Sequence, residues 1–264
     1  MAAISNGLAA YSPNTIIPIT STFFIFYLYA VPGVRMGALQ HLQIIHVATH
    51  DSIDMGEDGP THQPIELANL YRAMPNLLYI RPGDSEETAG AWIAAIGAKQ
   101  TTCIISTSRQ TLLQLAQTRR DGVASGAYVP SEAESAAVTL IGVGAELSFA
   151  LEVTEQLKVQ KGITARVVSF PCQRLFENQS LDYKRTTLQR HRGIPAVVIE
   201  PYAPNGRERY ADAGISVTRF GQSLPAKAVY KVFGYEIATL TTKVASYLER
   251  IQEDELLRGE FADL

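Results

Sequence analysis

The sequence predicts an α/β fold with two doubly wound domains, whose sheets are mainly parallel. Short apolar runs rich in β-branched residues alternate with segments of helical periodicity, which is typical of βαβ units. The alternation is interrupted by a small, polar and acidic stretch, after which it restarts. Because 264 residues are enough for two domains of ordinary size, we expect a first domain over residues 1–127, a linker over 128–136 and a second domain over 137–264.

The first half of the chain is expected to form strands separated by one long loop and by helices. A buried strand ends the segment 38–50, and a loop of fourteen residues, Asp51–Pro64, follows it. A loop of this length within a compact fold is usually functional or flexible. Pro64 suits the first turn of a helix that ends near Met74. The other elements expected here are a strand at 77–80, a helix at 84–98 with Asp84 as its N-cap, and a strand at 103–106.

The second half of the chain repeats the alternation of strands and helices. Because helices separate the strands, a second parallel sheet is expected. The expected strands lie at 138–143, 166–170, 196–200 and 216–219. The expected helices lie at 146–160, 180–189, 225–233 and 237–254.

Charge is distributed unevenly along the chain. All 23 basic and 26 acidic residues lie after Val34. The resulting net charge of −3 excludes a polybasic nucleic-acid binder. The two cysteines are too few for a disulfide framework, which favours a reducing compartment.

The charge-free start predicts neither a membrane span nor a signal peptide. Its most apolar part, residues 16–31, is shorter than the roughly 20 apolar residues that a membrane helix needs, and it contains Pro18. A signal peptide begins with basic residues, whereas the first one here is Arg35. We therefore expect either a buried strand and helix, or a surface that another protein covers.

Acidic and imidazole side chains gather around the long loop. They are His50, Asp51, Asp54, Glu57, Asp58 and His62. Such groups bind hydroxyls or move protons near neutral pH, although an acidic loop is equally typical of a solvated surface turn. No metal site is expected, because His46 and His50 lie on a strand, where residues four apart stand about 13 Å from each other.

Longer motifs in the chain are more specific than these patterns. Residues 46–84 read HVATHDSIDMGEDGPTHQPIELANLYRAMPNLLYIRPGD, which resembles the pyrimidine-binding domain of transketolases, above all in THDS, GEDGPTHQP and RP-x-D. The resemblance extends back to TFFIFYLY and forward to Ser108-Arg109-Gln110. In the second half, SFPCQRLFENQSLDY, VVIEPYAPNGRERYADAG and RFGQSLP resemble the transketolase C-terminal domain, in the form of the fungal dihydroxyacetone synthases. The chain is thus identified as the C-terminal portion of a transketolase-family enzyme.

This resemblance implies a reaction, cofactors and partners. Transketolases use thiamine diphosphate with Mg or Ca to move a two-carbon ketol unit from a ketose phosphate to an aldehyde. In the dihydroxyacetone synthase branch these substrates are xylulose 5-phosphate and formaldehyde. The resemblance implies that the metal and diphosphate are held mainly by a domain that this chain lacks. We therefore expect a partner subunit that carries this domain, or a homo-oligomer, in the cytoplasm or the peroxisome.

The resemblance also assigns an aromatic pocket to the charge-free start. Phe23, Phe26 and Tyr29 match the residues that surround the pyrimidine ring of the cofactor, where aromatic side chains provide offset stacking. Their spacing of three is also typical of a buried helix face.

Four polar residues match substrate-binding positions of the family. His50 and His62 match histidines that are catalytic and contact the substrate. Asp58 matches the carboxylate that binds a substrate hydroxyl. Arg109 matches an arginine that binds the substrate phosphate, a role that suits the planar guanidinium group.

Departures from the family pattern affect what the chain does alone. The family's Arg-Glu-His-Ala stretch, whose glutamate hydrogen-bonds the pyrimidine, would immediately precede Met1, so the first domain is expected to be truncated at its N-terminus. Thr20-Ser21 replaces a Gly-Gly pair, and the added side chains are expected to crowd the backbone there.

Three functions therefore remain open. The chain is a subunit of a split ketol-transferring enzyme, or a catalytically inactive fragment that acts as an interaction or regulatory module. Alternatively, it is an α/β protein that binds a small molecule and is unrelated to ketol transfer. The retained aromatic and polar site residues favour the first.

Overall fold

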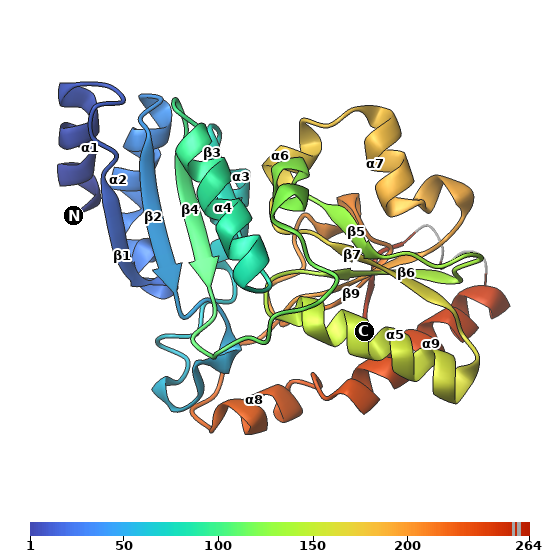
Figure 1. Cartoon of the computed structure of the whole chain (residues 1–264). Coiled ribbons are helices and arrows are strands. Elements are labelled where there is room, and N and C mark those ends of the chain that lie inside the picture. The colour runs from blue at the N-terminus through green and yellow to red at the C-terminus, as the bar shows by residue number, and fades with distance from the viewer. Residues whose placement is uncertain (255–256, 258–259) are drawn as a thin grey trace.

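The strands of the computed structural model form two sheets that lie side by side (Figure 1). The structure describes residues 1–254, 257 and 260–264. The first sheet has the order β1-β2-β4-β3, and all its strand pairs are parallel. Its strands are β1 (Ile19–Phe23), β2 (Ile44–Thr49), β3 (Leu77–Ile80) and β4 (Thr102–Thr107).

Helices cover both faces of the first sheet, because its inner strands are apolar on both sides. Helices α2 and α3 pack on one face around Val34, Tyr71 and Ile104, whereas α4 packs on the other with Ala91 against Ile105. Helix α1 lies against α2. The bounds are α1 (Ala2–Tyr11), α2 (Tyr27–Leu39), α3 (Leu67–Ala73) and α4 (Ser85–Gly97).

The second sheet has the order β10-β9-β8-β6-β7-β5 and is parallel except for the pair of β5 and β7. Its strands are β5 (Tyr128–Ser131), β6 (Val138–Gly142), β7 (Ala165–Ser169), β8 (Ala196–Ile199), β9 (Ala213–Ile215) and β10 (Ala262–Asp263). The expected fold class, α/β with mainly parallel sheets, is confirmed.

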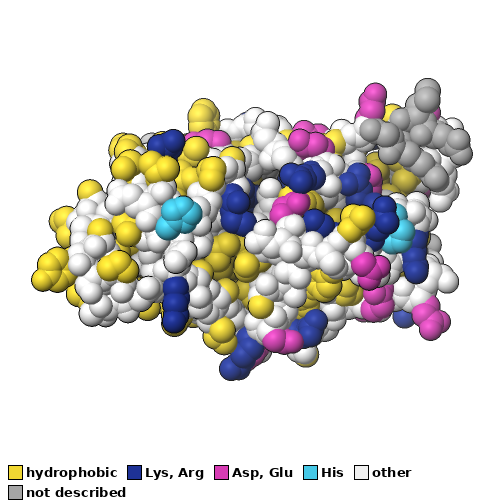
Figure 2. All heavy atoms as spheres, turned by 90° about the horizontal axis from the view of Figure 1, so that it is seen from above, with side chains coloured by type: hydrophobic (Ala, Val, Ile, Leu, Met, Phe, Trp, Pro, Cys, Tyr) yellow, Lys and Arg dark blue, Asp and Glu magenta, His cyan; other side chains and the backbone are white. Residues whose placement is uncertain are grey.

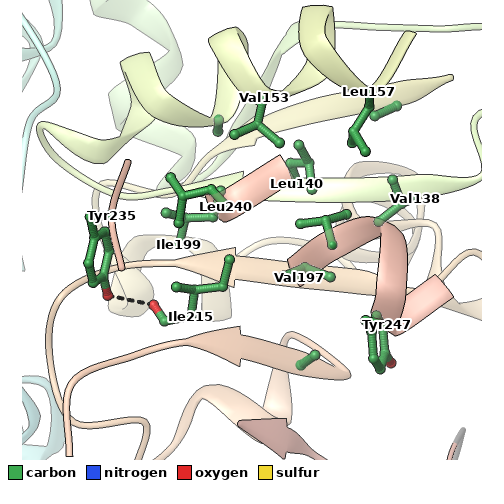
Figure 3. Close-up of a cluster of buried hydrophobic side chains, with 14 of the residues drawn as sticks. Val138, Leu140, Val153, Leu157, Val197, Ile199, Ile215, Tyr235, Leu240 and Tyr247 are labelled. Atoms are coloured by element: carbon green, nitrogen blue, oxygen red, sulfur yellow. Dashed lines mark hydrogen bonds between the residues drawn. The ribbon is translucent and has the colours of Figure 1, made fainter. Parts of the chain in front are cut away.

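Helices α5 and α9 cover one face of the second sheet, as Figure 3 shows. Val153 of α5 and Leu240 of α9 meet Leu140 and Ile199 of the strands. Helices α6 and α7 close the other face. The helices of this half are α5 (Glu146–Lys161), α6 (Gln173–Glu177), α7 (Leu181–Leu188), α8 (Ala226–Val232) and α9 (Ile237–Glu253).

Short 3-10 turns occupy several connections. They are η1 (Phe24–Phe26), η2 (Ile53–Asp58), η3 (Arg120–Ser125), η4 (Arg190–Arg192) and η5 (Arg207–Arg209). Of these, η2 lies in the long loop whose length in the sequence is typical of a functional or flexible segment. Local hydrogen bonds therefore order part of this loop.

Some expected elements differ from the structure because distant backbone groups compete for their hydrogen bonds. The helix expected to begin at Pro64 begins at Leu67, and the carbonyl of Ile65 accepts from the N–H of Ala203 instead, at 3.0 Å. The strand expected at 216–219 is wrong: β9 lies three residues earlier, and beyond it the N–H of Val217 bonds the carbonyl of Tyr202.

Part of the expected linker is a strand. Residues Tyr128–Ser131 form β5 at the edge of the second sheet, antiparallel to β7. Tyr128 is buried, and its hydroxyl donates to the carboxylate of Glu87 on α4 at 2.8 Å. A polar composition alone does not reveal such a contact between distant segments.

Thr20 is accommodated within the first sheet rather than crowding it. Its hydroxyl lies 2.6 Å from Nδ1 of His46 on β2 and 3.1 Å from the hydroxyl of Tyr27. Both partners are buried. The Thr20 side chain therefore has polar partners in the sheet.

The charge-free start forms an apolar outer surface, which we call the N-terminal face. Its exposed large hydrophobic residues lie on α1, β1, α2 and the segments that join them. They are Met1, Ile4, Leu8, Tyr11, Ile16, Ile19, Phe26, Leu28, Tyr29, Met36 and Leu39. Figure 2 shows hydrophobic side chains gathered over this end of the molecule, whereas charged side chains concentrate over the other half. Among the described residues, no helix is long and apolar enough to span a membrane.

A buried charge network, centred on Arg81, joins the two halves. Arg81 follows β3, and its Nε donates to Asp51 Oδ2 at 2.7 Å. Its Nη1 donates to the carbonyl of Val143 at 2.7 Å, and lies 2.7 Å from Glu146 Oε2 and 3.5 Å from Glu200 Oε1. Because Val143, Glu146 and Glu200 belong to the second half, one side chain connects both sheets.

Further arginines complete this network around Glu200. Arg72 donates to both carboxylate oxygens of Glu200, at 3.0 and 2.6 Å, and Arg207 binds the same group. Burial by itself raises the pKa of Glu200, but the arginines outweigh it and lower the pKa to about 2. Positive charge offsets the burial of Glu146 less than that of Glu200, and burial raises the pKa of Glu146 to about 7. The charges of this network are therefore mutually dependent.

We expect Arg81→Met to destabilise the fold by about 3–5 kcal/mol, because it leaves buried carboxylates without their shared cation. Urea unfolding measures the change in unfolding free energy. Arg120→Met, which breaks an exposed ion pair with Glu86, is the control and should change stability little. Equal effects of the two substitutions would contradict the importance of the buried network.

Candidate functional site

The carboxyl ends of three neighbouring parallel strands meet at one edge of the first sheet. Phe23 ends β1, His50 directly follows β2, and Arg109 lies two residues beyond β4. The parallel register pairs Phe23 with Thr49 and Thr49 with Thr107, so the three strand ends are level. Open α/β sheets bind ligands at this edge, and the loop with η2 follows β2 there (Figure 1).

Phe23, Phe26 and Tyr29 form a row of rings at this edge, which we call the aromatic shelf. The centroids of Phe23 and Phe26 are 5.8 Å apart with nearly parallel planes, and those of Phe26 and Tyr29 are 6.5 Å apart. Phe26 and Tyr29 are 38% and 81% exposed, whereas Phe24 and Tyr27 are buried. These rings therefore do not form a buried helix face, and their flat surfaces are open to a planar ligand.

Two histidine rings pack against the aromatic shelf. His50 stacks on Phe23 with centroids 3.7 Å apart, and His62 meets Phe26 edge-on at 5.4 Å. In each case Nδ1 is near a neighbouring threonine hydroxyl, at 3.0 Å for His50 and 2.9 Å for His62. Among the described residues, the Nε2 atoms of these two rings have no hydrogen-bond partner. Both rings thus keep one nitrogen available to a ligand.

His50 is held in a rare backbone conformation next to the charged residues of the site. Its φ is 59°, in the left-handed region that few residues other than Gly adopt, although His, Asn and Asp are enriched there, and such conformations cluster at functional sites. Burial lowers the pKa of His50 and so does Arg109, whereas Asp58 and Asp51 act in the opposite direction. At pH 7 the imidazole is therefore neutral, and it is close enough to Arg109 and Asp58 to respond to their charges.

The acidic residues of the long loop divide into two pairs. Glu57 and Asp58 are exposed, as a solvated turn would be, and Asp58 ends η2. Asp51 and Asp54 are 1% exposed, and their carboxylates accept from Arg81 and from the Ser108 hydroxyl. Of the two exposed acids, Asp58 is the one whose charge acts on His50, which makes it the candidate to bind a ligand hydroxyl.

Residues far along the chain hold this loop in place. The Tyr202 hydroxyl donates to the carbonyl of Asp51, next to His50, and Gln63 Nε2 donates to the carbonyl of Gln222 at 3.1 Å. Neither contact follows from local sequence patterns. The available signal is that Gln63 and Arg81 lie inside the GEDGPTHQP and RP-x-D motifs.

Gly56 allows the loop to contact the second half closely. Its φ is 74°, and a Cβ atom there would lie 3.1 Å from the nitrogen of Ala226 and 3.2 Å from the carbonyl oxygen of Leu224. Ser223, in the same segment, donates to the carbonyl of Glu57 at 2.6 Å. The start of α8 therefore packs closely against η2 and holds it in place.

The site contains no cluster suited to a metal ion. In the part of the chain that the structure describes, no three His, Cys, Asp or Glu side chains are grouped to hold one. The polar side chains that pack against the aromatic shelf are instead two imidazoles, His50 and His62, and the charges of Asp58 and Arg109 act on His50.

The fold and this site define an α/β protein with a ligand site at the carboxyl ends of its strands. Residues 1–114 match the family described as "Transketolase, pyrimidine binding domain", and residues 126–236 match "Transketolase-like TK C-terminal domain". The chain belongs to the transketolase family, of which it contains these two domains.

Individual relatives agree with this assignment. Dihydroxyacetone synthase of Pichia angusta is 46% identical over 266 residues, which cover 100% of this chain and 37% of that protein. The transketolase structure from Leishmania mexicana has a TM-score of 0.90 at 39% identity and covers 94% of this chain and 36% of that one. A Pichia stipitis transketolase in complex with sedoheptulose 7-phosphate has a TM-score of 0.92 at 36% identity, and the match covers 96% of this chain and 37% of that one. The chain thus spans about 37% of the first of these relatives.

We expect the pKa of His50 to move in opposite directions when its charged neighbours are removed. Arg109→Ala removes a positive charge and should raise the pKa, whereas Asp58→Asn removes a negative charge and should lower it. NMR titration of the His50 imidazole measures both. Arg185→Ala, an exposed arginine on α7, should leave it unchanged. Shifts of the same sign would show that Arg109 and Asp58 do not border His50 as described.

Proposed function

We propose that this chain provides the pyrimidine-binding and substrate-binding side chains of a thiamine-diphosphate-dependent enzyme. The reaction is the transfer of a two-carbon ketol unit from a ketose phosphate to an aldehyde. One observation carries the proposal: an open aromatic shelf converges with hydroxyl-binding and phosphate-binding side chains at one edge of the sheet. These residues are Phe23, Phe26, Tyr29, His50, Asp58, His62 and Arg109.

The aromatic shelf suits the pyrimidine ring of thiamine diphosphate. Phe26 and Tyr29 expose their rings, and offset stacking on a flat heterocycle would remove this apolar area from water. When bound, the cofactor supplies the electron sink that carbon–carbon bond cleavage needs. The diphosphate and a Mg or Ca ion would be held by another domain or chain, as the greater length of the relatives supports.

The polar residues would bind and orient the sugar. Neutral His50 would accept or donate a proton near the ketose carbonyl, and His62, which meets Phe26 edge-on, would contact the substrate beside it. Asp58 accepts a hydrogen bond from a sugar hydroxyl. Arg109 pairs with the phosphate group, for which its planar donors are suited.

The identity of the two substrates is proposed from the relatives. The likeness to a transketolase in complex with sedoheptulose 7-phosphate supports a phosphorylated ketose as the donor. The likeness to dihydroxyacetone synthase supports a very small aldehyde, formaldehyde, as the acceptor.

We expect ketol transfer when this chain is combined with a chain that carries the diphosphate-binding domain, thiamine diphosphate and Mg²⁺. With xylulose 5-phosphate and formaldehyde, Arg109→Ala should raise KM for the sugar phosphate roughly 10–100-fold, because it removes charged hydrogen bonds. The change in kcat should be smaller. Steady-state kinetics measures both constants.

The control for this experiment is Arg185→Ala, which removes an exposed arginine from α7 and should leave KM unchanged. If the assembled wild-type proteins transfer no ketol unit, the proposal fails. The chain would then be a catalytically inactive interaction or regulatory module, which is one of the alternatives that the sequence leaves open.

We also propose that a partner subunit covers the N-terminal face. Tyr11 and Tyr29 are more than 80% exposed there, and Ile4 and Ile19 more than 50%. Many large apolar side chains exposed within one region of a protein surface mark an interaction site. The partner is a second copy of this chain or the subunit with the diphosphate-binding domain, and the aromatic shelf lies within the covered area.

We expect the purified chain to self-associate at micromolar concentration through the N-terminal face. Leu28→Glu, which places a charge on the exposed side of α2, should shift the protein toward the monomer in sedimentation velocity. Leu113→Glu is the matched control, because Leu113 is 82% exposed but lies outside this face. A monomeric wild-type chain would contradict the expectation.

A further inference from the structure

Two rings of the aromatic shelf stand at the start of α2, where the usual means of fixing a helix are missing. Phe26 is the N-cap residue of α2, and its side chain cannot bond the free N–H groups of the first turn. No acidic residue lies in that turn either. Pro32 lies inside the helix and removes one of its hydrogen bonds. The place of the segment that carries Phe26 and Tyr29 therefore depends on tertiary contacts.

Tyr27, the first residue of α2, is held through both its side chain and its backbone. Its hydroxyl donates to the carbonyl of Thr20 on β1 at 3.3 Å and lies 3.1 Å from the Thr20 hydroxyl. The same hydroxyl lies 3.4 Å from the carbonyl of Val47 on β2. Tyr71 of α3 donates to the carbonyl of Tyr27 at 2.6 Å. Two strands and a neighbouring helix thus fix this one residue of the segment.

Packing alone does not explain a hydroxyl at position 27. Tyr27 is 2% exposed, and the ring of a phenylalanine would fill the same apolar space. Burial raises the pKa of Tyr27 to about 12, so its hydroxyl stays protonated and donates. Because a buried hydroxyl destabilises a fold unless it is hydrogen-bonded, the link that it makes to β1 explains it better.

Thr20 connects Tyr27 to a buried histidine. Thr20 is paired with His46 across β1 and β2, and its Oγ1 lies 2.6 Å from Nδ1 of that ring. A threonine hydroxyl donates one hydrogen bond and accepts two, so Thr20 can satisfy both His46 and Tyr27. Burial lowers the pKa of His46 to about 4, and the ring is therefore neutral at pH 7. The three side chains form an uncharged buried network.

The segment that Tyr27 fixes divides its rings between the interior and the site. Phe24 and Tyr27 are buried, whereas Phe26 and Tyr29 expose their rings. Phe26 directly precedes Tyr27, and Tyr29 lies in the same helical turn. A rotation of this turn would move the exposed rings away from the carboxyl edge of the sheet. A fixed Tyr27 therefore determines the direction of both rings.

We propose that Tyr27 is a positioning residue, which acts through Thr20 and His46 to hold the rings of Phe26 and Tyr29 in place for one planar heterocycle. The heterocycle, the pyrimidine of thiamine diphosphate, rests on the proposed function, whereas the anchoring of the rings does not. Tyr27 does not itself touch the ligand, because its side chain is buried within the first domain.

NMR relaxation of the full chain tests the anchoring without any ligand. The backbone N–H order parameters of Phe26 and Leu28 should fall from about 0.85 toward about 0.6 in Tyr27→Phe and in Thr20→Val. Thr20→Ser keeps the hydroxyl and should retain the wild-type values. Values near 0.85 in both of the first two variants would overturn the positioning role, and Thr20→Val decides alone if Tyr27→Phe does not fold.

Tyr235→Phe is the matched control. Tyr235 is also a buried tyrosine, and its hydroxyl donates to the carbonyl of Ile215 in the second half at 2.7 Å (Figure 3). The substitution removes a buried hydrogen bond, as Tyr27→Phe does, and should lower the unfolding free energy in a similar way. The order parameters of Phe26 and Leu28 should not change. An equal fall in this control would attribute the effect to a general loss of stability and contradict the proposal.

Steady-state kinetics of the assembled enzyme tests the effect on the ligand. Tyr27→Phe and Thr20→Val should each raise KM for thiamine diphosphate at least about tenfold, because a loosely held shelf must be ordered on binding. KM for xylulose 5-phosphate, and kcat at saturating cofactor, should stay within about twofold. Thr20→Ser should restore the wild-type KM for the cofactor.

The two experiments separate failure of this inference from failure of the proposed function. A fall in order with an unchanged KM for thiamine diphosphate would overturn the role in cofactor binding. Equal rises in KM for the cofactor and for the sugar phosphate would show general damage to the site and overturn that role as well. If the wild-type assembly transfers no ketol unit, the proposed function fails, and the order parameters still decide the anchoring.

Discussion

The guanidinium of Arg81 is the group on which the arrangement of the two sheets depends. It stands at the carboxyl end of β3 and is fully buried among carboxylates from both halves of the chain. In this buried environment each charge is stabilised by its oppositely charged neighbours, because an unpaired buried ion would strongly destabilise the fold. The network therefore specifies one relative placement of the sheets, to which the contacts of Arg72 and Arg207 with Glu200 contribute.

This placement has a direct consequence for the site. Asp51 binds Arg81 through its side chain and Tyr202 through its carbonyl, and His50 is the adjacent residue. The second half of the chain contributes none of the seven proposed site residues, yet its segment 202–226 fixes the loop on which Asp58 and His62 lie and which His50 directly precedes. The two domains thus act as one unit, in which the second provides the rigid support that a binding site requires.

The distribution of charge along the sequence corresponds to the distribution of surfaces in space. The uncharged first 34 residues form the edge of the first sheet and the helices beside it, where large apolar side chains remain exposed. On the face that Figure 2 shows, charged side chains concentrate over the other half of the molecule. An edge strand such as β1 also presents unpaired backbone groups, so this side of the sheet is suited to association.

The sequence by itself determined the parallel α/β architecture, because apolar runs and helical periodicity are local properties. The buried strand at 77–80 and the helix that Asp84 caps follow from a few neighbouring residues, and long motifs indicated the family. Only the tertiary structure decided which members of the acidic loop are buried, because Asp51 and Asp54 obtain their partners, Arg81 and Ser108, from other strands. It likewise decided that Tyr128–Ser131 pair with β7 rather than serving as a linker, since pairing between distant segments leaves no local pattern.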